Sequence, residues 1–353
     1  MARKVAKPVP AKPVELDPRK AAILEAVVTE HIGTAQPVGS GSIASNERVG
    51  VSPATVRSEM VALERDGFLA QPHTSAGRIP TDRGYRYFVD HLRHGALGAA
   101  QTYEVGQFFG NVRGEIEDVL EQTSTLLTRL TRYTSVVVGP NHARATVRSS
   151  QLVDLGPRRV LLVAILSDGA VEKRTLELDG DVSANDVADA SAQLHGLLIG
   201  ASLDQRVEVP GRSNIVSNLV RVAASALYLS APTSDGDHLF IGGSSKIAES
   251  FEAVETVRNV LGILEQELVV VTLIQDILDR GMSVAIGAEN GNELLSACAV
   301  VVAPVAIDGV AAGAVGLLGP TRMNYAEALA TAQAVSEHLT ERYGSAESAI
   351  SRG

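Results

Sequence analysis

The sequence has few of the residues that build disulfides, cysteine metal centres and large aromatic cores. Of its 353 residues one is cysteine, none is tryptophan and 4% are aromatic. The single cysteine, Cys298, excludes an intrachain disulfide and a metal site built from cysteines. Because it lies in an apolar run, we expect a small buried hydrophobic residue, with a redox sensor as the alternative.

The sequence also lacks a hydrophobic run long enough to cross a bilayer. Its most apolar stretch, 294–307, contains Pro304 and ends at Asp308, so it is shorter than the ~20 residues that a spanning helix needs. The first residues are rich in lysine and proline and contain no apolar segment of a secretion signal, so 1–15 is predicted to be a disordered arm. We therefore expect a cytoplasmic protein without membrane contact.

Charge is distributed unevenly along the chain. The net charge of −10 argues against a protein that binds polyanions without selectivity. Residues 1–95 carry a balance of +3, whereas the remaining 258 residues carry −13. This asymmetry suggests an N-terminal nucleic-acid module on an acidic body, although an imbalance of this size also fits chance.

Residues 16–95 carry the signals of a small DNA-binding domain. Asp17-Pro18 and Ser52-Pro53 each place a capping residue before a proline at the first helical position. A short helix is predicted at 40–45, and a hairpin follows the third helix at 68–79. This order predicts a winged helix-turn-helix, a domain that places side chains on duplex DNA.

The third helix is predicted to bury one stripe of side chains and to present the rest to DNA. Val56, Met60 and Leu63 form the apolar stripe, and Arg57 on the other side could bind a guanine through two hydrogen bonds. A solvated helix face is the alternative interpretation. The predicted DNA-binding residues are Ser52, Ala54, Thr55, Arg57 and Ser58 in the helix, and His73, Thr74, Ser75, Arg78, Arg83 and Arg86 in the hairpin and the helix after it.

This domain resembles the N-terminal domain of the heat-inducible transcription repressor HrcA family. The resemblance lies in PVGS at 37–40, VSPATVR at 51–57, QPHTSAGRIPTDRGYR at 71–86 and FVD at 88–90. Ser58 departs from the family pattern, which usually has asparagine there. An asparagine could read adenine, whereas a serine reaches less far.

Beyond residue 100 the sequence predicts an α+β body. A helix over 104–132 has a heptad-like apolar seam, which either forms a dimer coil or packs on the following sheet. Strand patterns at 135–178 and 282–318 enclose a helical stretch. They predict one α+β domain, built from 100–205 and 275–345, that is interrupted by an insertion at 206–274.

The family resemblance extends into this body. It lies in IGG at 241–243, LGILEQE at 261–267, IGAEN at 286–290 and GPTRMNY at 319–325. The resemblance implies an α+β multidomain protein in which the discontinuous domain is GAF-like and the insertion at 206–274 is dimerising. It also implies a homodimeric repressor of heat-shock chaperone operons that binds the inverted-repeat CIRCE operator on double-stranded DNA. The chaperonin GroEL would maintain its activity, which would be lost on heat shock.

Two other classes of function compete with this one. GAF-like domains often bind small ligands, so a small-molecule-responsive transcription regulator is the alternative to a chaperonin-dependent repressor. An enzyme is the second class, but the sequence has no nucleophile–base pattern, paired carboxylates or metal-ligand cluster at meaningful spacing. We therefore expect no enzyme, no catalytic residue, no cofactor and no metal.

Overall fold

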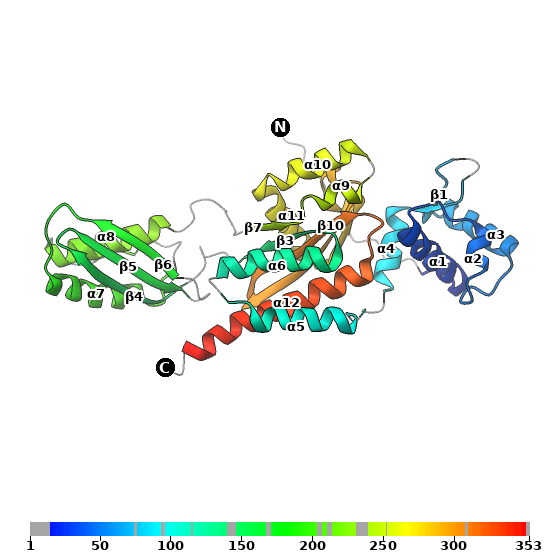
Figure 1. Cartoon of the computed structure of the whole chain (residues 1–353). Helices are drawn as coiled ribbons and strands as arrows, with labels where there is room; N and C mark the ends of the chain where they lie inside the picture. The colour runs from blue at the N-terminus through cyan, green and yellow to red at the C-terminus, as the bar shows by residue number, and fades with distance from the viewer. Residues whose placement is uncertain are drawn as a thin grey trace, which may run out of the picture. The chain divides into compact units, whose positions relative to one another are not determined.

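The chain forms two compact units that meet in sequence at Leu92 and Arg93. The computed structural model describes residues 15–73, 76–92, 95, 97–113, 116–139, 146–166, 171–202, 207–209, 214–230, 239–251, 253–307 and 310–350 (Figure 1). The division between the units lies close to the predicted end of the N-terminal domain at residue 95.

The first unit has three helices, a two-stranded antiparallel sheet and a fourth helix. Their bounds are α1 Pro18–Thr34, α2 Ser40–Ala44, α3 Pro53–Arg65, β1 Leu69–Ala70, β2 Ile79–Pro80 and α4 Asp82–Asp90. The Asp17 and Ser52 side chains cap α1 and α3, which confirms both predicted helix starts. The core of this unit includes Ile23, Leu24, Val27, Val56, Leu63 and Phe68, each at most 2% exposed.

The second unit contains a five-stranded sheet in the order β7-β3-β10-β9-β8, with all neighbours antiparallel. The strands are β3 Thr134–Val138, β7 Leu239–Gly242, β8 Val284–Ile286, β9 Cys298–Ile307 and β10 Val310–Pro320. β3 is thus an interior strand, and both of its partners come much later in the sequence. Every one of its five residues is buried.

Helices cover both faces of the five-stranded sheet. Figure 1 shows α10 and α11 on one side and α6 and α12 on the other. On the first side Val136 and Val300 pack in one apolar cluster with Ile274, while Val137 and Val301 on the other side are 0% exposed. The helices that belong to this part of the second unit are α5 Ala99–Asn111, α6 Ile116–Thr131, α9 Lys246–Ser250, α10 Val254–Leu264, α11 Glu267–Asp279 and α12 Tyr325–Ile350. Two short 3-10 helices, η2 Gly287–Asn290 and η3 Glu293–Leu295, belong to it as well.

The single helix predicted over 104–132 is two helices in the structure. α5 ends at Asn111, because Val112 adopts an extended conformation with φ −60° and ψ 130°. The seam of α6 packs on the sheet, which was one of the two interpretations: the Ser135 hydroxyl in β3 donates to the Ser124 carbonyl in α6 at 2.6 Å. The apolar residues keep their helical spacing on both sides of the break at Val112. Periodicity alone therefore did not reveal that α5 and α6 are separate helices.

A three-stranded antiparallel sheet interrupts the five-stranded one. It has the order β4-β5-β6 and is followed by two helices. The elements are β4 Val147–Gly156, β5 Arg159–Leu166, β6 Val171–Glu177, α7 Ala184–Leu198 and α8 Ile215–Ser230. They build their own apolar cluster around Leu162, Leu194 and Val220.

The interruption therefore lies earlier in the chain than the predicted insertion at 206–274. The chain leaves the five-stranded sheet after Val138 and returns at Leu239, since these two residues are partners in the β3–β7 pairing. α10 and α11, which the prediction placed in the insertion, pack on the five-stranded sheet. The physical reason is that strand pairing is non-local: the pattern of 239–242 predicts a strand but not its partner.

α7 protects one edge of the three-stranded sheet. The Leu152 amide in β4 donates to the Ser191 hydroxyl at 2.9 Å, and the Ser150 amide donates to His195 Nδ1 at 3.4 Å. These side chains occupy backbone donors of an edge strand, which would otherwise be open to pairing.

One face of the three-stranded sheet is apolar and partly open; we call it the outer face. The opposite face packs on α7 and α8 in the cluster around Leu162. Because side chains alternate along a strand, the outer face carries the other set. Its apolar members are Val153, Leu155, Leu161, Val163, Ile165 and Val171, and its polar members include Gln151, Lys173 and Thr175. Val153, Leu155 and Val171 are 37%, 48% and 48% exposed. Apolar surface of this kind often marks a site of protein association.

Two glycines in β10 are expected to respond oppositely to substitution. A Cβ on Gly316 would lie 3.4 Å from Ile274 Cδ1 and would extend into an apolar cavity, whereas a Cβ on Gly313 would lie 2.3 Å from the Val138 carbonyl oxygen. We expect Gly316→Ala to raise the free energy of unfolding by about 0.5 to 1 kcal/mol, and Gly313→Ala to lower it by about 2 kcal/mol or more. Urea titrations followed by circular dichroism measure both, and equal shifts for the two variants would contradict the packing.

Candidate nucleic-acid interface

One face of α3 is open to solvent and the opposite face is buried. Val56, Met60 and Leu63 are 0%, 4% and 0% exposed, as predicted for the apolar stripe. Ala54, Arg57 and Ser58 are exposed. Neither the Arg57 guanidinium nor the Ser58 hydroxyl has a hydrogen-bond or ion-pair partner among the described residues. Arg57 therefore presents an uncompensated positive charge and a full set of donors.

The two hydroxyls at the start of α3 serve the helix itself. The Ser52 side chain accepts the Thr55 amide at 3.2 Å, and the two side-chain oxygens are 3.0 Å apart. This cap satisfies a free amide of the first turn and fixes where α3 begins. Ser52 and Thr55 thus position the exposed face that Arg57 and Ser58 occupy.

A tight hairpin follows α3. Its turn is held by the Gln71 side chain, which donates to the Ala76 carbonyl at 3.0 Å, and by the Ala76 amide, which donates to the His73 carbonyl at 2.9 Å. His73 is exposed at the tip. Thr74 and Ser75, also predicted to bind DNA, lie outside the described residues. A Cβ on Gly77 would lie 2.2 Å from the Val38 carbonyl oxygen, so only glycine fits there.

The three arginines predicted in the hairpin and α4 all make contacts within the unit. Arg83 donates to the Asp66 carbonyl at 2.9 Å and lies over the Phe68 ring at 4.5 Å from its centroid. It therefore stabilises the carboxyl end of α3. Arg86 forms an ion pair with Asp90 at 3.3 Å.

Arg78 ties the hairpin to α3. Its Nη2 lies 2.8 Å and its Nε 2.9 Å from the same Glu64 oxygen, and its side chain is 16% exposed. Its backbone also exchanges two hydrogen bonds of 2.8 Å with Val38, before α2. The Arg78 side chain, predicted to bind DNA, is thus engaged with a carboxylate on α3. Sequence reasoning missed this partner, because Glu64 and Arg78 are joined only by the turn geometry.

We expect Arg78→Ala to loosen the hairpin locally. The substitution leaves the Glu64 carboxylate without its largely buried partner. This should lower the local stability of the hairpin by about 1 to 2 kcal/mol. Hydrogen exchange at the Val38 and Arg78 amides of the full-length protein should then be about five- to thirtyfold faster. Glu64→Gln should have a similar effect, and the double variant should add little to either. If the effects of the two single variants on exchange simply add in the double variant, Arg78 and Glu64 do not act as a pair.

The match to a known family decides the chain's membership. The family model described as "HrcA protein C terminal domain" matches residues 117–329, more than half of the chain. The chain belongs to the HrcA family. Curated HrcA relatives extend the match to the N-terminal unit, because they align over more than nine-tenths of the sequence.

Two relatives illustrate the similarity. The heat-inducible transcription repressor HrcA of Carboxydothermus hydrogenoformans is 36% identical over 338 residues, which cover 93% of this chain and 98% of the relative. That of Streptomyces avermitilis is 36% identical over 333 residues, which cover 92% and 98%. A solved structure described as a hypothetical protein superposes with a TM-score of 0.63 at 21% identity, covering 94% of this chain and 100% of the other. That likeness shows a shared fold.

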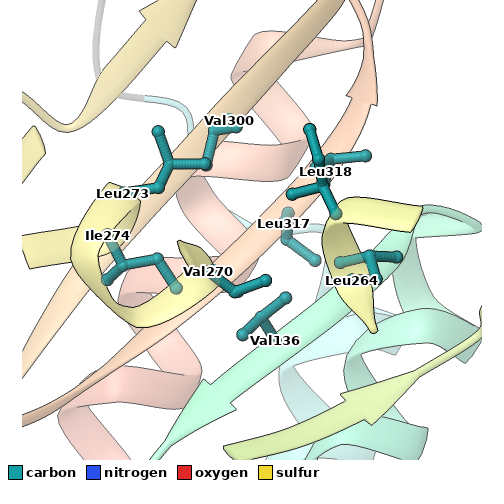
Figure 2. Close-up of a pocket in the computed structure, with 10 residues that line it drawn as sticks. Val136, Leu264, Val270, Leu273, Ile274, Val300, Leu317 and Leu318 are labelled. Carbon is teal, nitrogen blue, oxygen red and sulfur yellow. The ribbon is translucent and has the colours of Figure 1, made fainter. Parts of the chain in front are cut away.

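A small cavity in the HrcA-matched part offers little to a metabolite. It lies between α10, α11 and the sheet, and is lined by valine, leucine, isoleucine and glycine, Val136, Ile274 and Leu318 among them (Figure 2). Its volume of about 10 Å³ is close to that of one water. Ligand pockets hold hundreds of cubic ångströms and place polar groups for orientation. This cavity is therefore too small and too apolar to hold a metabolite.

Cys298 is buried, as predicted. It is 0% exposed in the apolar cluster of β9, and burial raises its pKa to about 12. A thiol with this pKa stays protonated at neutral pH and reacts poorly. Among the described residues, no group of three metal-ligating side chains comes together. None of the described helices has the length and hydropathy needed to span a bilayer.

Proposed function

We propose that this HrcA-family chain represses transcription of heat-shock chaperone operons by binding an inverted-repeat operator, the CIRCE element, as a homodimer. The observation that carries the proposal is the exposed face of α3, where Arg57 has no partner among the described residues, next to the hairpin that ends in His73. It is supported by the relatives, which are named heat-inducible transcription repressors.

The order of elements in the first unit supports a winged helix-turn-helix. In this proposal α2 and α3 would be the helix pair, with α3 as the recognition helix, and β1 and β2 would form the wing. In this mode the first turns of the recognition helix enter the major groove. Arg57 would read a guanine, Ala54 and Ser58 would contact neighbouring groups, and His73 with Thr74 and Ser75 would reach the backbone or the minor groove. Arg78, Arg83 and Arg86 would mainly hold these parts in place.

Dimerisation is the second part of the proposal. The outer face of the three-stranded sheet presents apolar side chains, of which Leu155 and Val171 are each 48% exposed. Pairing of two copies through this face would remove that area from water. A twofold dimer would then present two α3 helices to the two half-sites of an inverted repeat. In this proposal the dimerising insertion spans 147–230.

The remaining parts follow from the family. The chaperonin GroEL would maintain the active form, and unfolded clients that occupy the chaperonin during heat shock would lift repression. The protein would act in the cytoplasm, as a DNA-binding regulator without catalytic activity. A multidomain chain with an interrupted sheet is the kind of substrate that benefits from a chaperone while folding.

Footprinting tests this proposal as a whole. The full-length protein is incubated with DNA from upstream of its own chaperonin operon, with and without purified chaperonin. We expect protection of an inverted repeat, stronger when chaperonin is present and lost after heating without it. Protection of no inverted repeat in either case would reject the repressor proposal. If protection is the same with and without chaperonin, only the chaperonin-dependent part of the proposal is rejected.

A further inference from the structure

Val61 is an apolar side chain in the middle of the open face of α3. It is 50% exposed, although Val56, Met60 and Leu63 on the same helix are almost fully buried. An isolated exposed valine is ordinary in a protein. What distinguishes Val61 is its position, because it shares a face with the predicted DNA-reading side chains but was absent from them.

Helix geometry places Val61 in line with those side chains. At about 100° per residue, Ala54, Ser58 and Val61 lie within about 60° of one another around the axis, and Arg57 lies about 40° from Val61. All four are exposed, and the buried stripe lies on the opposite side. A duplex that lies along this face would pass Val61 as well as Arg57.

The position adds nothing to helix stability. Valine is a poorer helix former than alanine by about 0.5 kcal/mol, and half of this side chain remains in water. Alanine would therefore serve the helix at least as well. A surface that covers Val61 would give the valine a role that the helix itself does not.

The major groove offers one apolar group, the C5 methyl of thymine. Val61 follows Arg57 by four residues, which is about 6 Å along the helix axis, and base pairs follow each other every ~3.4 Å. The spacing corresponds to about two base-pair steps. We propose that Val61 is a specificity-determining residue that packs on a thymine methyl about two base pairs from the guanine read by Arg57. This inference rests on the proposed DNA-binding function.

The electrostatic surroundings are compatible with such a contact. The nearest carboxylate along this side of α3, Glu64, is paired with Arg78 at 2.8 Å. Arg65, one turn after Val61, has a side chain that is 79% accessible, and its Nε lies 3.7 Å from Asp66 Oδ1. A valine between two arginines on an open helix face can meet a base edge while the cations attract the phosphates.

The test couples one methyl group on the protein with one on the DNA. Duplexes that bind the full-length protein are first selected from a random pool. Each thymine of the selected site is then replaced in turn by deoxyuridine, which lacks only the C5 methyl. Wild-type protein should lose about three- to tenfold in affinity at one thymine per half-site. Val61→Ala should bind the unmodified site more weakly by a similar factor, and should be insensitive to deoxyuridine at that position.

Val61→Thr is the matched variant, because threonine keeps the shape and one methyl of valine. It should retain most of the discrimination between thymine and deoxyuridine, while deoxyuridine outside the half-sites should change nothing. If wild type and Val61→Ala lose the same affinity at every deoxyuridine, or if neither loses affinity at any of them, the inference is rejected. Sequence-specific binding by the protein would still hold in that case. If the wild type selects no sequence at all, both the inference and the proposed function fail.

Discussion

Arg57→Ala is expected to abolish selective operator binding while the first unit stays folded. The side chain is exposed and has no partner within the described part of the chain, so its loss removes no contact there. A bidentate arginine–guanine contact contributes about 1 to 3 kcal/mol of discrimination, which is about five- to 150-fold per half-site. Because the proposed dimer would use two half-sites, the combined loss would approach the limit of non-specific binding. Gel shifts at fixed salt, with operator and scrambled duplexes, measure it.

Two variants separate base reading from simple attraction. Arg57→Lys keeps the charge but loses the planar fork, so it should bind both duplexes with little preference. Arg65→Ala removes an exposed cation from the last turn of the same helix. It should weaken binding to both duplexes equally and lower the salt dependence. If Arg57→Ala keeps the wild-type preference, α3 does not read the operator through this residue.

Leu161→Glu is expected to convert a dimer into monomers. Leu161 lies on the central strand β5, where its neighbours on the outer face are Val153 and Thr175. A carboxylate at the centre of a symmetric apolar interface occurs twice and loses its water, which costs several kcal/mol. The dissociation constant should rise by at least about 100-fold. Light scattering should report one chain of 37.0 kDa instead of two, and operator affinity should fall with it.

The control places the same charge on a different surface. Ile215 begins α8 and is 56% exposed, but α8 packs on the face of the sheet opposite to the outer face. Ile215→Glu should therefore leave the mass and the operator affinity unchanged. Circular dichroism must show that both variants are folded. A wild type that is monomeric at working concentrations, or a Leu161→Glu variant that remains dimeric, would contradict this interface.

Local signals in the sequence predicted local structure well. The caps at Asp17 and Ser52 both start helices as expected, since each depends on residues within one turn. The buried stripe of α3 followed from periodicity alone, and so did its exposed opposite face. Helical periodicity was therefore sufficient to place Arg57 on the exposed side of α3.

The features that sequence reasoning missed depend on long-range partners. Arg78 and Arg83 were predicted to bind DNA, but folding brings Glu64 and the end of α3 within reach of them. The bounds of the insertion differed because the partner of β3 lies about a hundred residues away. Val61 was passed over because an apolar residue in a helix suggests a core, and only its exposure shows otherwise.

The place of β3 in the five-stranded sheet has a kinetic consequence. Its neighbours, β7 and β10, are both synthesised later, after the whole three-stranded segment. At ~5 to 20 residues per second, a nascent chain waits about 5 to 20 s between β3 and β7. Through that interval five apolar or small residues that end up fully buried have no strand beside them. High contact order also slows their pairing once the chain is complete. The time during which this protein is vulnerable to aggregation is thus set by its topology rather than by its final stability.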